Sequence, residues 1–177
     1  MDEDILNKTV IYINTSNATF YNNSSYDFYY DIVDPIKNAV YMKILKSEII
    51  LNPSGSINGK VIEDCDPVYI QIKNFNRVST NINGNNFKCT DYILLNISDK
   101  FGTVVPNANV SFKTEYTSTS CHITDTNMII INPIEPNLKR FNIQLYDKNN
   151  IIIPKSAITK FSMIVCLYSN RKKITQF

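Results

Sequence analysis

The stretch that decides the fold is DPIKNAVYMKILKSEIILN, from Asp34 to Asn52. Its first apolar positions recur at every second residue, which is the period of a strand with one buried face. These positions are Val40, Met42 and Ile44. The alternation then slips by one residue, and the inward positions become Leu45, Ser47, Ile49 and Leu51. Such a slip turns later side chains to the other face unless a β-bulge absorbs it, so the stretch predicts one long, bent strand with a bulge near Ile44.

The composition agrees with a protein of strands and turns. Asn and Ile together make up more than a quarter of the 177 residues. Ile favours strands because its branched Cβ packs well on a pleated surface, whereas Asn favours turns because it tolerates left-handed backbone. Both residues also have AT-rich codons, so a genomic bias is an alternative explanation. The alternation patterns decide in favour of β structure.

Alternation with a period of two recurs along most of the chain. The clearest further segments are 10–13, 26–32, 68–72, 92–97, 110–116, 141–145 and 161–168. We expect Pro35 to end the strand before it, and Pro133 and Pro136 to bracket a turn, because proline cannot donate to a ladder. About ten strands separated by turn signals predict an all-β, antiparallel β-sandwich.

The predicted sandwich is a single jelly roll with an extra N-terminal strand or arm. We expect an N-terminal arm and polar loop over residues 1–25, the jelly-roll domain over 26–170, and a basic C-terminal tail over 171–177. Residues 1–13 contain no positively charged start followed by an apolar run, so no signal peptide is expected. No apolar stretch of about 18 residues occurs, so no membrane span is expected.

The charge pattern favours no nucleic-acid partner. The formal net charge is +2, which is close to balanced. The one dense basic cluster, Arg171-Lys172-Lys173, is interpreted as a solvated tail, with contact to an acidic partner or to nucleic acid as the alternative.

The cysteines and the single histidine do not predict a metal site. The four cysteines are Cys65, Cys89, Cys121 and Cys166, and none stands in a C-x-x-C pair. Tetrahedral zinc sites usually draw on such close pairs, so we expect reduced thiols in a cytosolic product. His122 adjoins Cys121, but neighbours on a strand point to opposite faces.

The sequence predicts no catalytic or cofactor-binding site. A Ser-His-Asp or Cys-His arrangement would have to use His122, and the four glycines form no phosphate loop. Carboxylates for acid–base work or for calcium could come from Asp64, Asp66 or Glu115, although a solvated loop is the favoured interpretation. We therefore expect a protein that is not an enzyme and that holds no cofactor or metal.

The aromatic residues suggest either a core strand or an interface. The chain has eleven Tyr and nine Phe but no Trp. Tyr26, Phe28 and Tyr30 share one predicted face, and Tyr29 lies on the other. Tyrosine is enriched at protein interfaces because it buries area and keeps a polar tip, so both interpretations stay open.

Residues 34–40, Asp-Pro-Ile-Lys-Asn-Ala-Val, and the strand that follows them resemble small single jelly-roll capsid proteins of giant and other nucleocytoplasmic large DNA viruses. Val68–Ile72 is similar to a second strand of that family, and Phe161–Val165 is similar to its closing strand. Leu51-Asn52-Pro53 stands where the family often has an Ile-Pro-Asn step.

The resemblance implies a structural virion protein, a penton-type capsid protein that assembles at icosahedral vertices. It implies self-association, as a homopentamer, and contacts with major and minor capsid proteins, without a small-molecule substrate. The implied location is the virion capsid, after synthesis in the host cytoplasm. The alternatives are a minor capsid protein that cements the major capsid lattice, a receptor- or carbohydrate-binding β-sandwich module and, third, an enzyme on a β scaffold.

Overall fold

The computed structural model describes residues 6–52, 56–57, 60–61, 66–73, 75, 77–80, 86–94 and 128–170. The larger strands in these ranges are β1 (Leu6–Asn14), β3 (Asp27–Leu51), β6 (Pro67–Ile72), β10 (Ile129–Tyr146) and β11 (Ile158–Asn170). The shorter strands are β2 (Thr19–Phe20), β4 (Ser56–Ile57), β5 (Lys60–Val61), β7 (Arg77–Thr80), β8 (Asn86–Cys89) and β9 (Asp91–Leu94). Two 3₁₀ turns, η2 (Thr15–Asn17) and η3 (Lys155–Ala157), join the larger strands.

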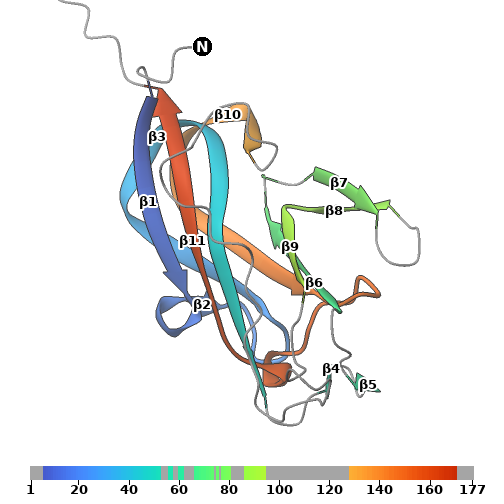
Figure 1. Ribbon diagram of the computed structural model, residues 1–177. Helices are drawn as coiled ribbons and strands as arrows, with labels where there is room; N and C mark the ends of the chain where they lie inside the picture. The colour runs from blue at the N-terminus through green and yellow to red at the C-terminus, as the bar shows by residue number, and fades with distance from the viewer. Residues whose placement is uncertain are drawn as a thin grey trace, which may run out of the picture.

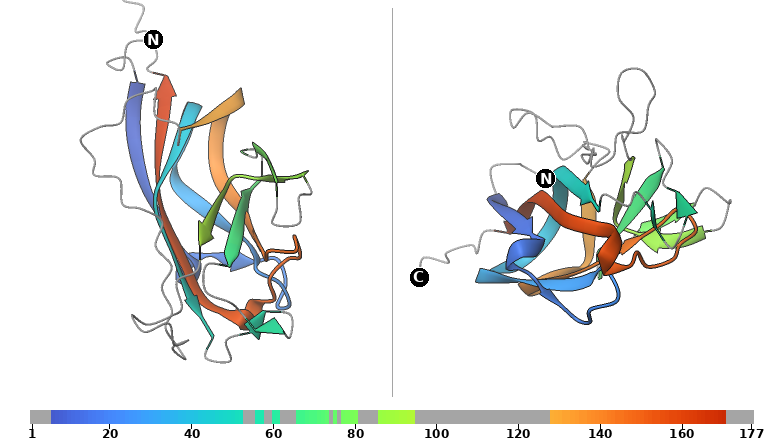
Figure 2. Two further views of the ribbon diagram at one scale, coloured as in Figure 1. Left: turned by 45° about the vertical axis from the view of Figure 1, so that its right-hand side comes forward. Right: turned by 90° about the horizontal axis from the view of Figure 1, so that it is seen from below.

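Most of these strands belong to one antiparallel sheet in the order β1-β11-β3-β10-β6-β9, with β2 added beside β3. The sheet curls strongly, so that its two halves enclose a core (Figures 1 and 2). β4–β5 and β7–β8 form separate two-stranded ladders. The all-β, antiparallel prediction is confirmed, whereas the order of the described strands does not establish the two four-stranded sheets of a jelly roll.

The stretch from Asp34 to Asn52, except for its last residue, lies in β3, the longest described strand. β3 pairs with β10 along one edge and with β11 along the other. On β11, Val165 pairs with Ile44 and the preceding Ile164 pairs with Lys46, so Leu45 is an extra residue. The predicted bulge is therefore confirmed, at the predicted place. It returns Ile49 and Leu51 to the core face that Met42 and Ile44 occupy.

Val40 departs from the prediction. Tyr41 pairs with Tyr168 and Ala39 pairs with Ser169, so Val40 is a second extra residue in β3. Ala39 consequently packs in the main core, whereas Val40 packs in a second cluster with Cys166 and Tyr168. The expectation that Val40 shares a face with Met42 is wrong, because the strand has two one-residue slips. The first slip falls at Ala39 and Val40, which are both apolar, so the alternation of polar and apolar residues does not reveal it.

The prolines do not interrupt the strands as expected. Pro35 lies inside β3 and Pro133 inside β10. Each falls where the register between β3 and β10 jumps, one between Leu138 and Arg140 and the other between Ile130 and Glu135. A residue in such a bulged segment is not required to donate to the ladder, so proline is tolerated there.

The main core lies inside the curled sheet, where the alternating faces predicted from the sequence meet. Tyr26 and Phe28 are buried, and Tyr30 and Ile32 pack partly against the same cluster. The predicted inward faces of β6, β10 and β11 are confirmed: Val68, Ile70, Ile72, Phe141, Ile143, Leu145, Phe161, Met163, Val165 and Leu167. The Phe28 and Phe161 rings lie 6.0 Å apart, so a ring contact in the core links β3 to β11 in addition to their ladder.

We expect Phe28→Ala to destabilise the protein by about 3–5 kcal/mol, because it removes a fully buried ring and leaves a cavity. Urea unfolding followed by circular dichroism measures this change. Val33→Ala, at a site that is 92% exposed on the same strand, is the matched control and should change the free energy of unfolding by less than about 0.5 kcal/mol. Equal effects of the two substitutions would contradict the assigned core.

Substitutions of Asn38 test the backbone conformation at this position inside β3. Its φ of 54° lies in the left-handed region, which Asn tolerates and β-branched residues avoid. Asn38→Gly should leave stability nearly unchanged, whereas Asn38→Val should lower it by about 1–2 kcal/mol. Thermal melts of both variants beside the wild type check this order, and a Val variant as stable as the Gly variant would contradict it.

Candidate functional site

Most of the chemical groups that the sequence singles out lie outside the part of the chain that the structure describes. Cys65, Cys121, His122, Asp64 and Glu115 all lie outside the described residues. Asp66 forms an ion pair with Lys148, with 3.1 Å between Oδ1 and Nζ. Cys89 and Cys166 are buried thiols. Across the described ranges, no three His, Cys, Asp or Glu side chains come together as a metal site would require.

The open edge of β1 is the first surface feature that suggests an interaction. β1 is the end strand of the sheet, and β11 is its one neighbour among the described strands. The strand is nine residues long and carries a single charged side chain, Lys8. Edge strands with few charges present unpaired N–H and C=O groups to other chains. The sequence predicted a strand here, but the edge position depends on pairing with the far end of the chain.

Exposed apolar side chains lie beside this edge. Val10 is 62% exposed and Tyr12 is 53% exposed. In the ladder, Val10 is opposite Cys166 and Tyr12 is opposite Ile164. We use the term β1 surface for the open edge of β1 together with Val10, Tyr12 and Ile164. It combines a strand edge that pairs with no second described strand with apolar side chains, as strand-pairing interfaces do.

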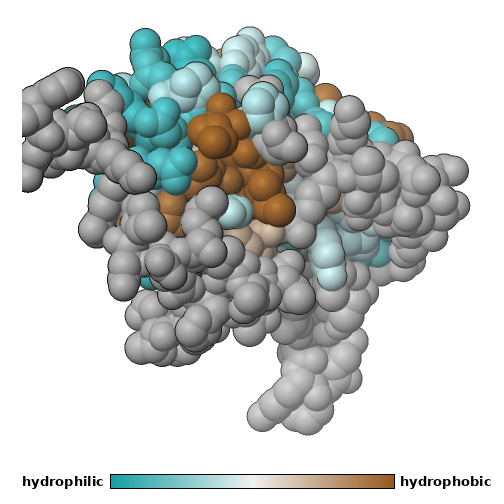
Figure 3. Space-filling model, turned by 90° about the horizontal axis from the view of Figure 1, so that it is seen from above, coloured by the Kyte–Doolittle hydropathy of each residue, from teal (hydrophilic) through white to brown (hydrophobic). Residues whose placement is uncertain are grey.

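A second exposed apolar area lies on the first part of β10. Ile130 is 70% exposed, and Ile134 is also exposed. Seen from above, apolar side chains gather in the middle of this end of the molecule and hydrophilic side chains lie beside them (Figure 3). Met128–Ile131 is a continuous apolar run, which is typical of a strand buried on both faces, but the exposure of Ile130 shows that this expectation is wrong here.

The outer face of β3 and β10 is polar and aromatic. Tyr29 lies on this face, and the Arg140 guanidinium stands 3.9 Å from the centre of its ring. Arg140 also binds Asp31 through two hydrogen bonds, of 2.6 and 3.2 Å, and this bonding raises the pKa of Arg140. The neighbouring Tyr21 donates to Asn142 and has the Lys73 amine 5.3 Å from its ring centre. Because cations cover these rings, the face is not a bare platform for stacking.

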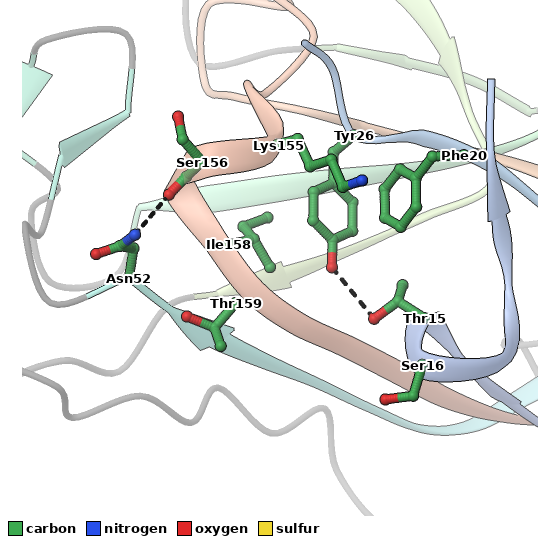
Figure 4. Close-up of a pocket in the computed structure, with 9 residues that line it drawn as sticks. All are labelled: Thr15, Ser16, Phe20, Tyr26, Asn52, Lys155, Ser156, Ile158 and Thr159. Atoms are coloured by element: carbon green, nitrogen blue, oxygen red, sulfur yellow. Dashed lines mark hydrogen bonds between the residues drawn. The ribbon is translucent and has the colours of Figure 1, made fainter. Parts of the chain in front are cut away.

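A cavity of about 390 Å³ opens at the end of the sheet where η2, η3 and the end of β3 meet (Figure 4). Its lining consists of Thr15, Ser16, Phe20, Tyr26, Asn52, Lys155, Ser156, Ile158 and Thr159. Hydroxyl and amide groups alternate there with two aromatic rings and one lysine. Sequence reasoning missed this site, because its residues come from three separate parts of the chain and form no motif.

Thr15 fixes the inner wall of the cavity. Its hydroxyl donates to the carbonyl of Phe161 and accepts from the Phe161 N–H, both at 3.1 Å. The Tyr26 hydroxyl donates to the same Thr15 oxygen at 3.3 Å. Burial raises the pKa of Tyr26 to about 12, and the hydrogen bond to Thr15 opposes that rise.

The curled antiparallel sheet defines this chain as an all-β protein. Comparison with protein-family models and with curated proteins finds no match to this chain. In the part of the chain that the structure describes, no helix has the length and apolar character needed to cross a membrane.

The raised pKa of Tyr26 predicts a loss of stability in alkali. Between about pH 10 and pH 12 the unfolded chain ionises this tyrosine while the folded chain keeps it neutral, so stability falls as the pH rises through this window. The shift of about two units corresponds to roughly 2–3 kcal/mol when fully expressed.

Tyr26→Phe should be less stable than the wild type at pH 8, by about 1 kcal/mol, because the bond to Thr15 is lost. The gap should close as the pH rises above 10. Urea unfolding at a series of pH values measures both effects. Tyr92→Phe, at an exposed tyrosine, is the control. Parallel pH profiles for Tyr26→Phe and the wild type would contradict the prediction.

Proposed function

We propose that this chain is a structural virion protein, a penton-type capsid protein that self-associates, as a homopentamer, at icosahedral vertices. A minor capsid protein that cements the major capsid lattice is the alternative within the same class. The observation that carries the proposal is the β1 surface, and the resemblance of residues 34–52 to small capsid proteins supports it.

The β1 surface has the features of an assembly contact. The edge of this nine-residue strand that pairs with no second described strand can add a strand from another chain, and backbone hydrogen bonds then supply much of the affinity. Val10 and Tyr12 would be covered in the same event, and tyrosine is favoured at the centre of interfaces. A monomer with this surface exposed would be prone to aggregate, and pairing with a defined partner would prevent this by covering the edge.

A closed ring requires two different surfaces on each subunit, because neighbours meet head to tail. The described sheet has two ends, β1 and β9. β9 is a short strand whose Tyr92 is 48% exposed. Contacts between the β1 surface of one subunit and the β9 end of the next would therefore join unlike surfaces, as a pentamer needs.

We expect the purified protein to form pentamers or larger species at micromolar concentrations. Val10→Lys should weaken association at least about tenfold, because it places a charge where an apolar contact is covered. Light scattering after size exclusion and sedimentation velocity measure the assembly, and circular dichroism verifies that the variant is folded.

Val33→Lys is the matched control, because it makes the same change at an exposed site on β3, a strand that β11 separates from β1. It should assemble like the wild type. A wild-type protein that stays monomeric over this range would overturn the proposal. Unchanged assembly of Val10→Lys would remove the β1 surface as its basis. The position of the chain in a map of the intact particle distinguishes a vertex protein from a minor capsid protein.

A further inference from the structure

The cavity beside Tyr26 is formed by segments that hydrogen bonds hold in place. The Asn52 side-chain amide donates to the carbonyl of Ser156 at 2.8 Å, and its backbone N–H donates to Ala157 at 2.9 Å. The Lys155 N–H donates to the carbonyl of Ser24 at 3.1 Å. These bonds join the end of β3, the loop before β3 and η3. The cavity is therefore preformed, which lowers the entropic cost of binding a ligand.

Lys155 gives the cavity its charge. Among the described residues that line the cavity it is the one charged residue, and none of them carries a carboxylate. Within the described ranges, the ion pairs of the protein join other residues, Arg140 with Asp31 and Lys148 with Asp66. The Lys155 amine lies 4.1 Å from the centre of the Phe20 ring, and Figure 4 shows it beside both Phe20 and Tyr26. A positive charge thus stands at the cavity wall, and no carboxylate of the described lining residues neutralises it there.

The remaining lining suits a molecule with both apolar and hydroxyl-bearing surfaces. The Phe20 and Tyr26 rings meet edge to face, with centres 5.2 Å apart, and Ile158 is buried beside the cavity. The hydroxyls of Ser16, Ser156 and Thr159 lie among the lining groups. Hydroxyl groups can both donate and accept, so they match the hydroxyls of a sugar.

We propose that this cavity binds a monosaccharide that carries one carboxylate, with the carboxylate at Lys155. The cavity volume, about 390 Å³, is within the range of small-ligand sites and suits one sugar ring. A single lysine matches a single negative charge, whereas sites for phosphate esters usually add arginines or a cradle of backbone N–H groups. The rim hydroxyls and the Asn52 amide would contact the sugar hydroxyls. This site is independent of the proposed assembly contact.

Binding is tested with the full chain and defined sugars. Saturation-transfer NMR and calorimetry use N-acetylneuraminic acid and glucuronic acid as acidic probes, and N-acetylmannosamine and glucose as neutral counterparts. We expect dissociation constants in the millimolar range for at least one acid, and at least about tenfold weaker binding of the neutral sugars. Sialyllactose separates the two possible sources, because a site for glycan ends accepts it and a site for free sugar acids does not.

Lys155→Gln keeps most of the side-chain stem and removes the charge. It should weaken binding of the acid about tenfold or more, while Lys155→Arg should retain it within about threefold. Lys139→Gln, at an exposed lysine on β10 outside the cavity, is the control and should bind like the wild type. Absence of binding by both acids, equal binding of acidic and neutral sugars, or unchanged binding by Lys155→Gln would each overturn the proposal.

Discussion

The pairing of β3 on both of its edges is the constraint on which the rest of the structure depends. β3 holds β10 on one side and β11 on the other, and these two strands carry β6 and β1 in turn. Its irregular positions set the shape of the whole sheet. The extra residues Val40 and Leu45 shift the register of β3 against β11, so the side chains that follow them change faces. The segment around Pro35 shifts the register of β3 against β10. Bulges increase local twist and bend a strand, so a single sheet can curl around its own core.

The sequence predicted the buried faces of the strands well, because apolar residues at every second position identify the side chains that point inward. The inward residues of 26–32, 68–72, 141–145 and 161–167 were all assigned correctly, and so was the bulge at Leu45. The prolines were misjudged because a proline signal does not distinguish the end of a strand from a bulge within it. Pro35 and Pro133 lie in bulges, where no ladder donor is required.

The surfaces were harder to predict than the core, since they depend on which strands become neighbours. Alternation places Val10 and Tyr12 on one face of a strand, but only the pairing of β1 with β11 makes β1 an edge. The cavity is harder still to predict from the sequence. Phe20, Asn52 and Lys155 line one cavity only because the sheet is curled, and their spacing along the chain does not predict that they lie together.

Cations placed on aromatic rings recur in this tryptophan-free chain. Lys8, Lys73, Arg140 and Lys155 lie over Tyr168, Tyr21, Tyr29 and Phe20 respectively. Each such contact contributes about 0.5–1 kcal/mol at an exposed site and shields a ring from water. Val10, which is 62% exposed, has no ring for a cation to cover.

The pairing of β1 with β11 also determines when the protein can fold. Leu6 lies opposite Asn170, so the first described strand can pair only after a segment 164 residues further along the chain has been synthesised. β3 needs the same late strand to complete its second edge. Closing such long loops is slow, and the apolar face of β3 stays uncovered meanwhile. In a nascent chain the apolar face of β3 therefore stays exposed from the synthesis of β3 until β11 has been made.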